Sequence, residues 1–164
     1  MNAAFDKLLP ALARGGVEFI LIGGMAGVIH GSGRATYDVD IVYARGAANL
    51  KRLAVALKPF KPYLRGAPAG LPFSLDVQTL RHGLNFTLTS IAGDIDLLGE
   101  AVGGGGYEYL KPQTITVEAF GAKFLCVDLP TLIKLKQAAG RPRDLEALAE
   151  LQALLDGHSP PGAS

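Results

Sequence analysis

Short apolar runs alternate along the chain with segments rich in glycine, proline or charge. The run at residues 17–22 is almost wholly apolar and ends at two glycines, which predicts a buried strand. β-Branched or alternating runs predict further strands over residues 38–43, 74–80, 85–90 and 94–98, and a hairpin over residues 113–120 and 123–127. Apolar residues at helical spacing predict helices over residues 3–13, 25–30 and 47–57.

The C-terminal part of the chain predicts two consecutive helices. Asp128 is placed to cap the first, over residues 129–139, and Gly140 to end it. The second begins at Pro142 and carries an apolar stripe formed by Leu145, Leu148, Leu151 and Leu155. We therefore expect an α/β (α+β) fold with a mixed β-sheet flanked by helices. The expected organisation is a core over residues 1–127, the helical pair packed on the same domain over residues 128–156, and a disordered tail over residues 157–164.

Composition narrows the class of protein. A chain of 164 residues that is 49% hydrophobic can build one ordinary core. Its net charge of +1 gives no general attraction for nucleic acid, although basic residues cluster within residues 51–65 and 134–143. The single cysteine, Cys126, excludes an internal disulfide and is expected in the core. The longest apolar stretch, residues 19–29, is shorter than the roughly 20 residues of a spanning helix, so we expect no membrane association and a soluble, cytoplasmic protein.

The first candidate for chemistry is a pair of aspartates at the start of a predicted strand. Asp38 and Asp40 are two residues apart, so their side chains point to the same face, about 6.5 Å apart along the backbone. Carboxylates held this close repel each other, and a divalent cation is the usual partner. The corner at Gly23-Gly24, where a strand meets a helix, offers backbone N–H groups that suit phosphate. Metal and phosphate together indicate nucleotide chemistry.

A second pair of acids, Asp94 and Asp96, has the same spacing on a later strand. A third carboxylate on a neighbouring strand would complete a metal clamp. Spacing alone leaves both residues open, but Asp96 lies between apolar Ile95 and Leu97, and a carboxylate in such a setting needs a stronger reason to be there. We therefore favour Asp96. The competing interpretation of such a pair is a surface strand with alternating acids.

Basic and hydroxyl residues lie on both sides of these acids in the sequence. Arg34 and Thr36 precede Asp38 and are candidates to contact phosphate and to donate a hydroxyl near the metals. Lys136, Arg141 and Asp144 lie around the break between the two C-terminal helices, where a basic turn would hold the triphosphate opposite the metals. The alternative for this turn is a solvated basic helix end, favoured by the helix dipole.

Two other nucleotide-binding patterns do not fit. A Walker-type loop needs Gly-x-x-x-x-Gly-Lys-Ser/Thr, and the sequence has no such run. A dinucleotide fingerprint would require glycine at Ile22, and it would place one acid at the far end of the second strand. Here two acids begin that strand, which disfavours a dinucleotide fold.

These residues, in this order, resemble the nucleotidyltransferase superfamily with the DNA polymerase β-type catalytic core. The similarity rests on the strand into Gly23-Gly24, the segment from Arg34 to Asp40, and the later Gly93-Asp94-Ile95-Asp96-Leu97. Within the superfamily, the chain is similar to small bacterial members and to the nucleotidyltransferase toxins of abortive-infection toxin–antitoxin systems. Their later helical motif is matched by Lys136, Arg141 and Arg143-Asp144, so the similarity spans residues 17–155.

The resemblance implies transfer of a nucleoside monophosphate from an NTP to an acceptor hydroxyl, with Mg²⁺ (or Mn²⁺) and release of pyrophosphate. It also implies metal binding by Asp38 and Asp40, with Asp96 as third carboxylate, which positions or deprotonates the acceptor. The nucleotide would be held by Gly23, Gly24, Arg34, Thr36, Lys136, Arg141 and Asp144, the last orienting Lys136 or assisting the acceptor.

The resemblance leaves the acceptor open among a tRNA end, a protein hydroxyl and a small molecule, and it points to an antitoxin or another partner chain that completes the site. Many members have Gly-Ser at the corner where this chain has Gly-Gly, so a serine contact to phosphate is absent there. The toxins are usually longer than this chain. The alternative function is a catalytically silent nucleotide-binding or protein-interaction module on the same fold.

Overall fold

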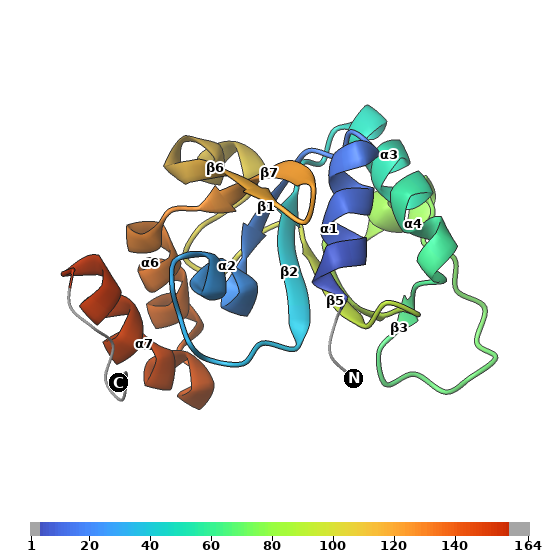
Figure 1. The fold of residues 1–164 in the computed structure, drawn as a ribbon. Coiled ribbons are helices and arrows are strands. Elements are labelled where there is room, and N and C mark those ends of the chain that lie inside the picture. The colour runs from blue at the N-terminus through green and yellow to red at the C-terminus, as the bar shows by residue number, and fades with distance from the viewer. Residues whose placement is uncertain (1–3, 158–164) are drawn as a thin grey trace.

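The fold was obtained as a computed structural model that describes residues 4–157, and it is of the mixed α/β class. Figure 1 shows α1, α3 and α4 grouped on one side of the molecule and α2, α6 and α7 on the other. The helices are α1 (Phe5–Arg14), α2 (Gly23–Ile29), α3 (Ala47–Leu57), α4 (Val77–His82), α5 (Tyr107–Leu110), α6 (Leu129–Ala139) and α7 (Pro142–Leu155). The strands are β1 (Phe19–Ile22), β2 (Asp38–Tyr43), β3 (Tyr63–Leu64), β4 (Asn85–Thr89), β5 (Asp94–Leu98), β6 (Thr114–Ala119) and β7 (Ala122–Val127).

The seven described strands form one sheet in the order β3-β4-β5-β2-β1-β7-β6. β2 lies in the middle, antiparallel to β1 and parallel to β5. β1 is also parallel to β7, while the outer pairs β3–β4, β4–β5 and β6–β7 are antiparallel. The sheet is therefore mixed, as predicted, and its centre carries the strands that begin with aspartate.

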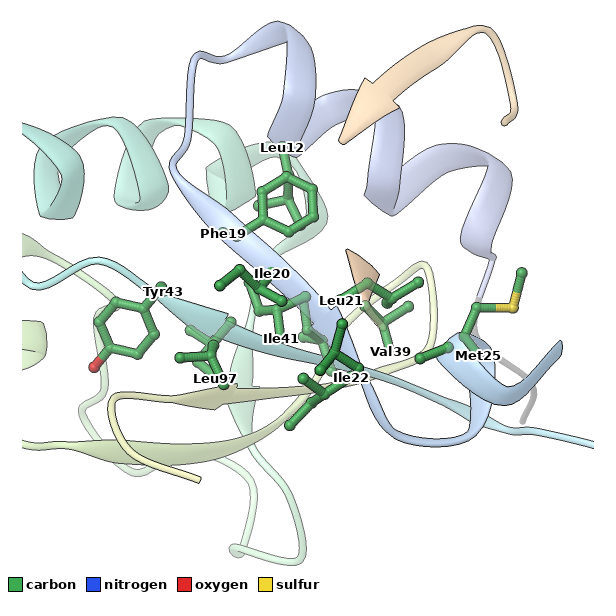
Figure 2. Close-up of a cluster of buried hydrophobic side chains, with 14 of the residues drawn as sticks. Leu12, Phe19, Ile20, Leu21, Ile22, Met25, Val39, Ile41, Tyr43 and Leu97 are labelled. Atoms are coloured by element: carbon green, nitrogen blue, oxygen red, sulfur yellow. The ribbon is translucent and has the colours of Figure 1, made fainter. Parts of the chain in front are cut away.

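The core packs around the two central strands. Figure 2 shows side chains from α1, β1, β2 and β5 meeting in one apolar cluster that includes Leu12, Ile20 and Leu97. All four residues of β1 are buried, and Phe19 stacks on Phe124 with ring centroids 6.0 Å apart. Tyr43 at the far end of β2 is fully buried, and its hydroxyl donates to the Leu84 carbonyl at 2.7 Å. This packing fixes β2 rigidly against its neighbours.

Elements with strong local signals lie where the sequence predicts them. α3 and α6 have the predicted bounds, and the strands of the predicted hairpin meet at a turn in which Gly121 has a positive φ of 74°. The Asp128 side chain accepts a hydrogen bond from Thr131 N at 2.9 Å at the start of α6. Gly140 ends that helix with φ 64°, a left-handed conformation that glycine adopts at low cost.

The prediction of a strand over residues 74–80 is wrong, because this segment leads into the helix α4. The Asp76 side chain accepts from Thr79 N at 2.8 Å and caps the first turn of α4. Only Leu80 of α4 is buried, so the alternation of apolar and polar residues here does not correspond to a strand with one covered face. β3 and α5 were not predicted, and the helix expected over residues 25–30 begins at Gly23.

The apolar stripe predicted for α7 is only partly buried. Leu151 is 2% exposed, but Leu145 is 53% and Leu155 is 43% exposed. α7 instead turns Ala147 and the charged Asp144 inward, at 7% and 1% exposure. The helix is rotated from the predicted orientation because Asp144 pairs with Lys136 of α6.

The two C-terminal helices pack against each other, and α6 also contacts α2. Cys126 lies in the core as expected, and burial raises the pKa of its thiol to about 12. The tail predicted over residues 157–164 falls, from residue 158 onward, outside the described residues, as does residue 3 of the first predicted helix. No helix within residues 4–157 has the length and apolar character needed to cross a bilayer.

Candidate active site

The pairing of β2 with β5 gathers four aspartates on one face of the sheet. The two strands are parallel, and their register sets Asp38 beside Asp94 and Asp40 beside Asp96. Val39 separates the two aspartates of β2, and Ile95 separates those of β5. Both residues point to the other face of the sheet and are fully buried in the core. Two acidic pairs from distant parts of the sequence thus become one cluster of carboxylates.

Three of these carboxylates converge. Asp38, Asp40 and Asp96 each offer an oxygen, and these three oxygens all lie within 4.8 Å of one another. Asp94 shares the face but does not belong to this group. The structure therefore brings Asp96, and not Asp94, together with Asp38 and Asp40. Three carboxylates at this spacing suit a hard divalent cation such as Mg²⁺.

The electrostatics of the group show the cost of bringing these charges together. Burial, followed by the neighbouring Asp96 and Asp38 carboxylates, raises the pKa of Asp40 from 3.8 to about 7. The charge of Lys136 opposes this rise. Asp40 is therefore partly protonated near neutral pH, although Lys136 lies close to it. A bound divalent cation would replace that proton.

Arg65, directly after β3, also lies in the acidic cluster, a position that no pattern in the sequence indicated. Its Nη2 donates to Asp96 Oδ1 at 2.7 Å, its Nε lies 3.3 Å from Asp94 Oδ2, and its Nη1 lies 4.0 Å from Asp38 Oδ2. Nη2 also donates to the Leu88 carbonyl at 2.7 Å, which anchors the guanidinium to β4. The Arg65 side chain is 27% exposed, so most of it is enclosed by these partners.

The glycine corner approaches the cluster closely. Gly23 has φ +72°, and a Cβ placed there would lie 2.1 Å from Asp40 Oδ2. A Cβ on Gly24 would lie 2.5 Å from the Thr36 hydroxyl oxygen. Both positions therefore require glycine for steric reasons, and both also line the cavity in front of the acids. The Thr36 hydroxyl occupies the space that a serine at residue 24 would use.

The segment before β2 is held against α7 by two glutamates. Ser32 Oγ donates to Glu150 Oε1, and Gly33 N donates to Glu150 Oε2 at 3.1 Å. Arg34 reaches Glu146 at 3.4 Å, but both side chains are largely exposed, so this pair contributes little. Glu150 thus fixes Ser32 and Gly33 to α7.

The basic turn between α6 and α7 is organised around Asp144. This carboxylate accepts from Arg141 Nε at 2.6 Å and from Arg141 N at 3.2 Å, and Lys136 Nζ lies 3.4 Å from its Oδ1. Burial favours the neutral form of Asp144, but the hydrogen bonds and charge of Arg141 and the charge of Lys136 outweigh it, so the pKa of Asp144 is lowered. Asp144 therefore contacts both cations and holds them at the turn.

Two adjoining cavities meet at the acidic cluster. The first, of about 300 Å³, is lined by Gly24, Arg34, Thr36 and Asp38. The second, of about 330 Å³, is lined by Asp96, Asp144 and apolar residues such as Leu98 and Leu132. Both cavities share the residues at their junction, which are Gly23, Asp40, Lys136, Arg141 and Arg143. Every site residue named from the sequence therefore lines one cavity or the other.

Arg65 and Glu150 are the contributors that sequence reasoning missed. Arg65 ends the basic cluster noted at residues 51–65, yet nothing in that pattern separates it from its solvated neighbours. Glu150 occupies an ordinary polar position of a helix.

Comparison of the chain with models of known protein families and with curated proteins found no match in either case.

Proposed function

We propose that this chain is a metal-dependent nucleotidyltransferase with the nucleotidyltransferase fold, which moves a nucleoside monophosphate from an NTP to an acceptor hydroxyl. The observation that carries the proposal is the position of the acidic group between two cavities. Asp38 faces the first cavity, Asp96 the second, and Asp40 lines both. A group transfer needs this arrangement, because donor and acceptor must meet at one charged centre.

The donor set fits a divalent metal. Asp38, Asp40 and Asp96 supply only oxygen ligands, and burial together with the Asp96 and Asp38 carboxylates raises the pKa of Asp40, which favours a further cation at the group. These residues would hold Mg²⁺ (or Mn²⁺), which supplies charge stabilisation at the reacting phosphate. Magnesium is therefore the expected cofactor.

The first cavity suits the NTP. Its lining contains the cations of Arg34, Lys136 and Arg141 together with the carboxylates of Asp38 and Asp40. Triphosphate oxygens can contact the cations on one flank and the metal-binding carboxylate group on the other. The Thr36 hydroxyl beside Gly24 offers a further donor.

The second cavity suits the acceptor. The acceptor hydroxyl oxygen attacks the α-phosphorus, the bond from that phosphorus to the β-phosphate oxygen breaks, and pyrophosphate leaves with the bonding electrons. Asp96 lines this cavity and is placed to position the hydroxyl or to take its proton. Lys136 and Arg141 lie where they can stabilise the departing pyrophosphate.

The family resemblance leaves the acceptor open among a tRNA end, a protein hydroxyl and a small molecule. A tRNA end or a protein hydroxyl is proposed, in a cytoplasmic toxin of a toxin–antitoxin pair. An antitoxin or another partner chain is proposed to contribute to the acceptor site.

Incubation with α-phosphate-labelled NTPs, total cellular RNA and lysate tests the proposal. Label on RNA supports a tRNA-modifying enzyme, and label on protein supports transfer to protein. Asp40→Asn should abolish the labelling, whereas Asp156→Asn, which removes an exposed carboxylate at the end of α7, should not. NTP binding without any transfer would show the silent binding module instead.

A further inference from the structure

Arg65 places a fixed positive charge among the carboxylates that form the candidate metal site. Its guanidinium lies within 4.0 Å of Asp38, Asp94 and Asp96, and none of its ion pairs in the described part of the chain involves Asp40. The cluster therefore has two sides. On one side, Arg65 offsets the negative charge of Asp38, Asp94 and Asp96. On the other side, around Asp40, Arg65 makes no ion pair.

The guanidinium is held in place by more than charge. The hydrogen bond from Nη2 to the Leu88 carbonyl fixes it to the neighbouring strand, and the same nitrogen holds one oxygen of Asp96. Its buried Nε lies 3.3 Å from Asp94 but makes no hydrogen bond, so the fork is placed by its Nη2 contacts and not by Asp94. Planar guanidinium groups suit this fixed geometry better than lysine does.

We propose that Arg65 acts as an internal counter-cation of the metal site. It pairs with Asp94 and Asp96 and leaves the corner formed by Asp38, Asp40 and Asp96 for a divalent cation. Because it shares Asp38 and Asp96 with that corner, it also weakens the binding of free metal there. Metal then binds well only together with the negative charge of a triphosphate.

This inference rests on the metal site of the proposed function. It makes a separate prediction about whether removal of Arg65 strengthens or weakens metal binding. Removal of a cation next to the corner should strengthen the binding of free metal, because the repulsion between the two cations disappears. A residue that merely supports the fold would have the opposite effect, since its loss would disorder the ligands. The direction of the change therefore distinguishes a counter-cation from a structural arginine.

The experiment titrates Mg²⁺ alone and Mn²⁺ alone into the full chain by calorimetry at about pH 8, where Asp40 has lost its proton. Arg65→Gln should bind each ion at least about ten-fold more tightly than the natural chain. Arg65→Lys keeps the charge and should stay within about three-fold of the natural chain. Arg45→Gln is the matched control, because Arg45 also donates to backbone carbonyls but lies away from the acids.

Unchanged or weaker metal binding in Arg65→Gln would overturn the inference. Equal gains in Arg65→Gln and Arg45→Gln would overturn it too, since the effect would then not arise at the acids. If the natural chain binds no free metal, a metal response that appears only in Arg65→Gln still supports the inference, and no response overturns it. Failure of the proposed function is separate, because it would appear as lack of transfer and of metal–NTP binding in the natural chain.

Discussion

The Asp40 carboxylate occupies the space that a side chain on Gly23 would need, because a Cβ there would lie 2.1 Å from Asp40 Oδ2. Gly23 also has a φ of +72°, which costs an L-residue about 1–2 kcal/mol. Gly23→Ala should therefore lower the free energy of unfolding by more than this amount and displace Asp40. Urea unfolding and metal–NTP binding measure the two effects.

Gly27 in the same helix provides the matched control for Gly23. A Cβ there would meet its nearest atoms at 3.6 Å or more, which is ordinary contact. Gly27→Ala should keep or raise stability, by up to about 1 kcal/mol, because alanine is the better helix residue. Equal losses in both variants would show that the contact with Asp40 is unimportant.

The stability of the metal-free protein should depend on pH through Asp40. Its pKa is about 7 in the folded chain against 3.8 without neighbours, so the folded chain binds the extra proton between these pH values. Stability should therefore fall as the pH rises from about 4 to 7 and then level off. Asp40→Asn should lack this component and become the more stable protein at about pH 8.

Denaturation of both proteins across this pH range measures the difference directly. The gap between Asp40→Asn and the natural chain should shrink toward pH 4 and close below it, because Asp40 is neutral in both states only below its unfolded pKa of 3.8. Asp156→Asn serves as the comparison for an exposed carboxylate and should show no such gap. A constant gap at every pH would contradict the raised pKa.

Lys136 and Lys134 differ in surroundings although they lie on one helix. The Lys136 side chain is 16% exposed and lies 3.4 Å from Asp144, whereas Lys134 faces solvent. A charge-assisted contact to phosphate contributes about 1.5–3 kcal/mol, so Lys136→Ala should weaken NTP binding roughly ten-fold to a hundred-fold. Lys134→Ala should leave it nearly unchanged.

Titration of NTP into the two lysine variants decides between the active-site interpretation and a solvated helix end. Binding of metal alone should change less than NTP binding in Lys136→Ala, because the expected partner is the triphosphate. Equal NTP affinities in the two variants would remove α6 from the nucleotide site.

Glu150 should stabilise the loop before β2, whereas Glu146 should contribute little to its stability. Glu150 accepts from both Ser32 and Gly33, and hydrogen bonds to a charged group contribute about 1.5–3 kcal/mol each. Glu150→Ala should therefore lower the unfolding free energy by more than about 1 kcal/mol and weaken NTP binding. Glu146→Ala breaks only an exposed pair and should change stability by less than about 0.5 kcal/mol.

Thermal or urea unfolding of the two glutamate variants gives the stability difference, and NTP titration gives the second readout. A loss of stability without any change in NTP affinity would show that the loop from Ser32 is structural and does not shape the nucleotide cavity.

The sequence predicted those parts of the fold that depend on neighbouring residues. The bounds of α3 and α6, the cap at Asp128 and the turn at Gly121 all follow from local geometry. The segment at residues 74–80 was mispredicted because its helix is decided by one cap at Asp76 and by packing of Leu80, and not by periodicity. β3 has only two residues and owes its existence to pairing with β4, which no local pattern reveals.

In the candidate site, too, the sequence predicted what neighbouring residues decide and missed what distant contacts decide. Period-two spacing predicted which face Asp38 and Asp40 share, but the approach of Asp96 depends on the parallel pairing of β2 with β5. Arg65 enters the cluster from β3, a strand without a sequence signal, and so remained hidden. Contacts between distant segments are set by tertiary packing, and a single sequence carries no direct record of them.

The alternation of acid and apolar residues in β2 and β5 also protects the fold against misassembly. If either strand slipped by one residue against its neighbour, the face that holds Val39 and Ile95 would receive carboxylates, at a large cost in desolvation. The four aspartates thus penalise every wrong register by an odd number of residues. Substitution of the aspartates by neutral residues should weaken this selection, so that such variants gain alternative strand pairings during folding.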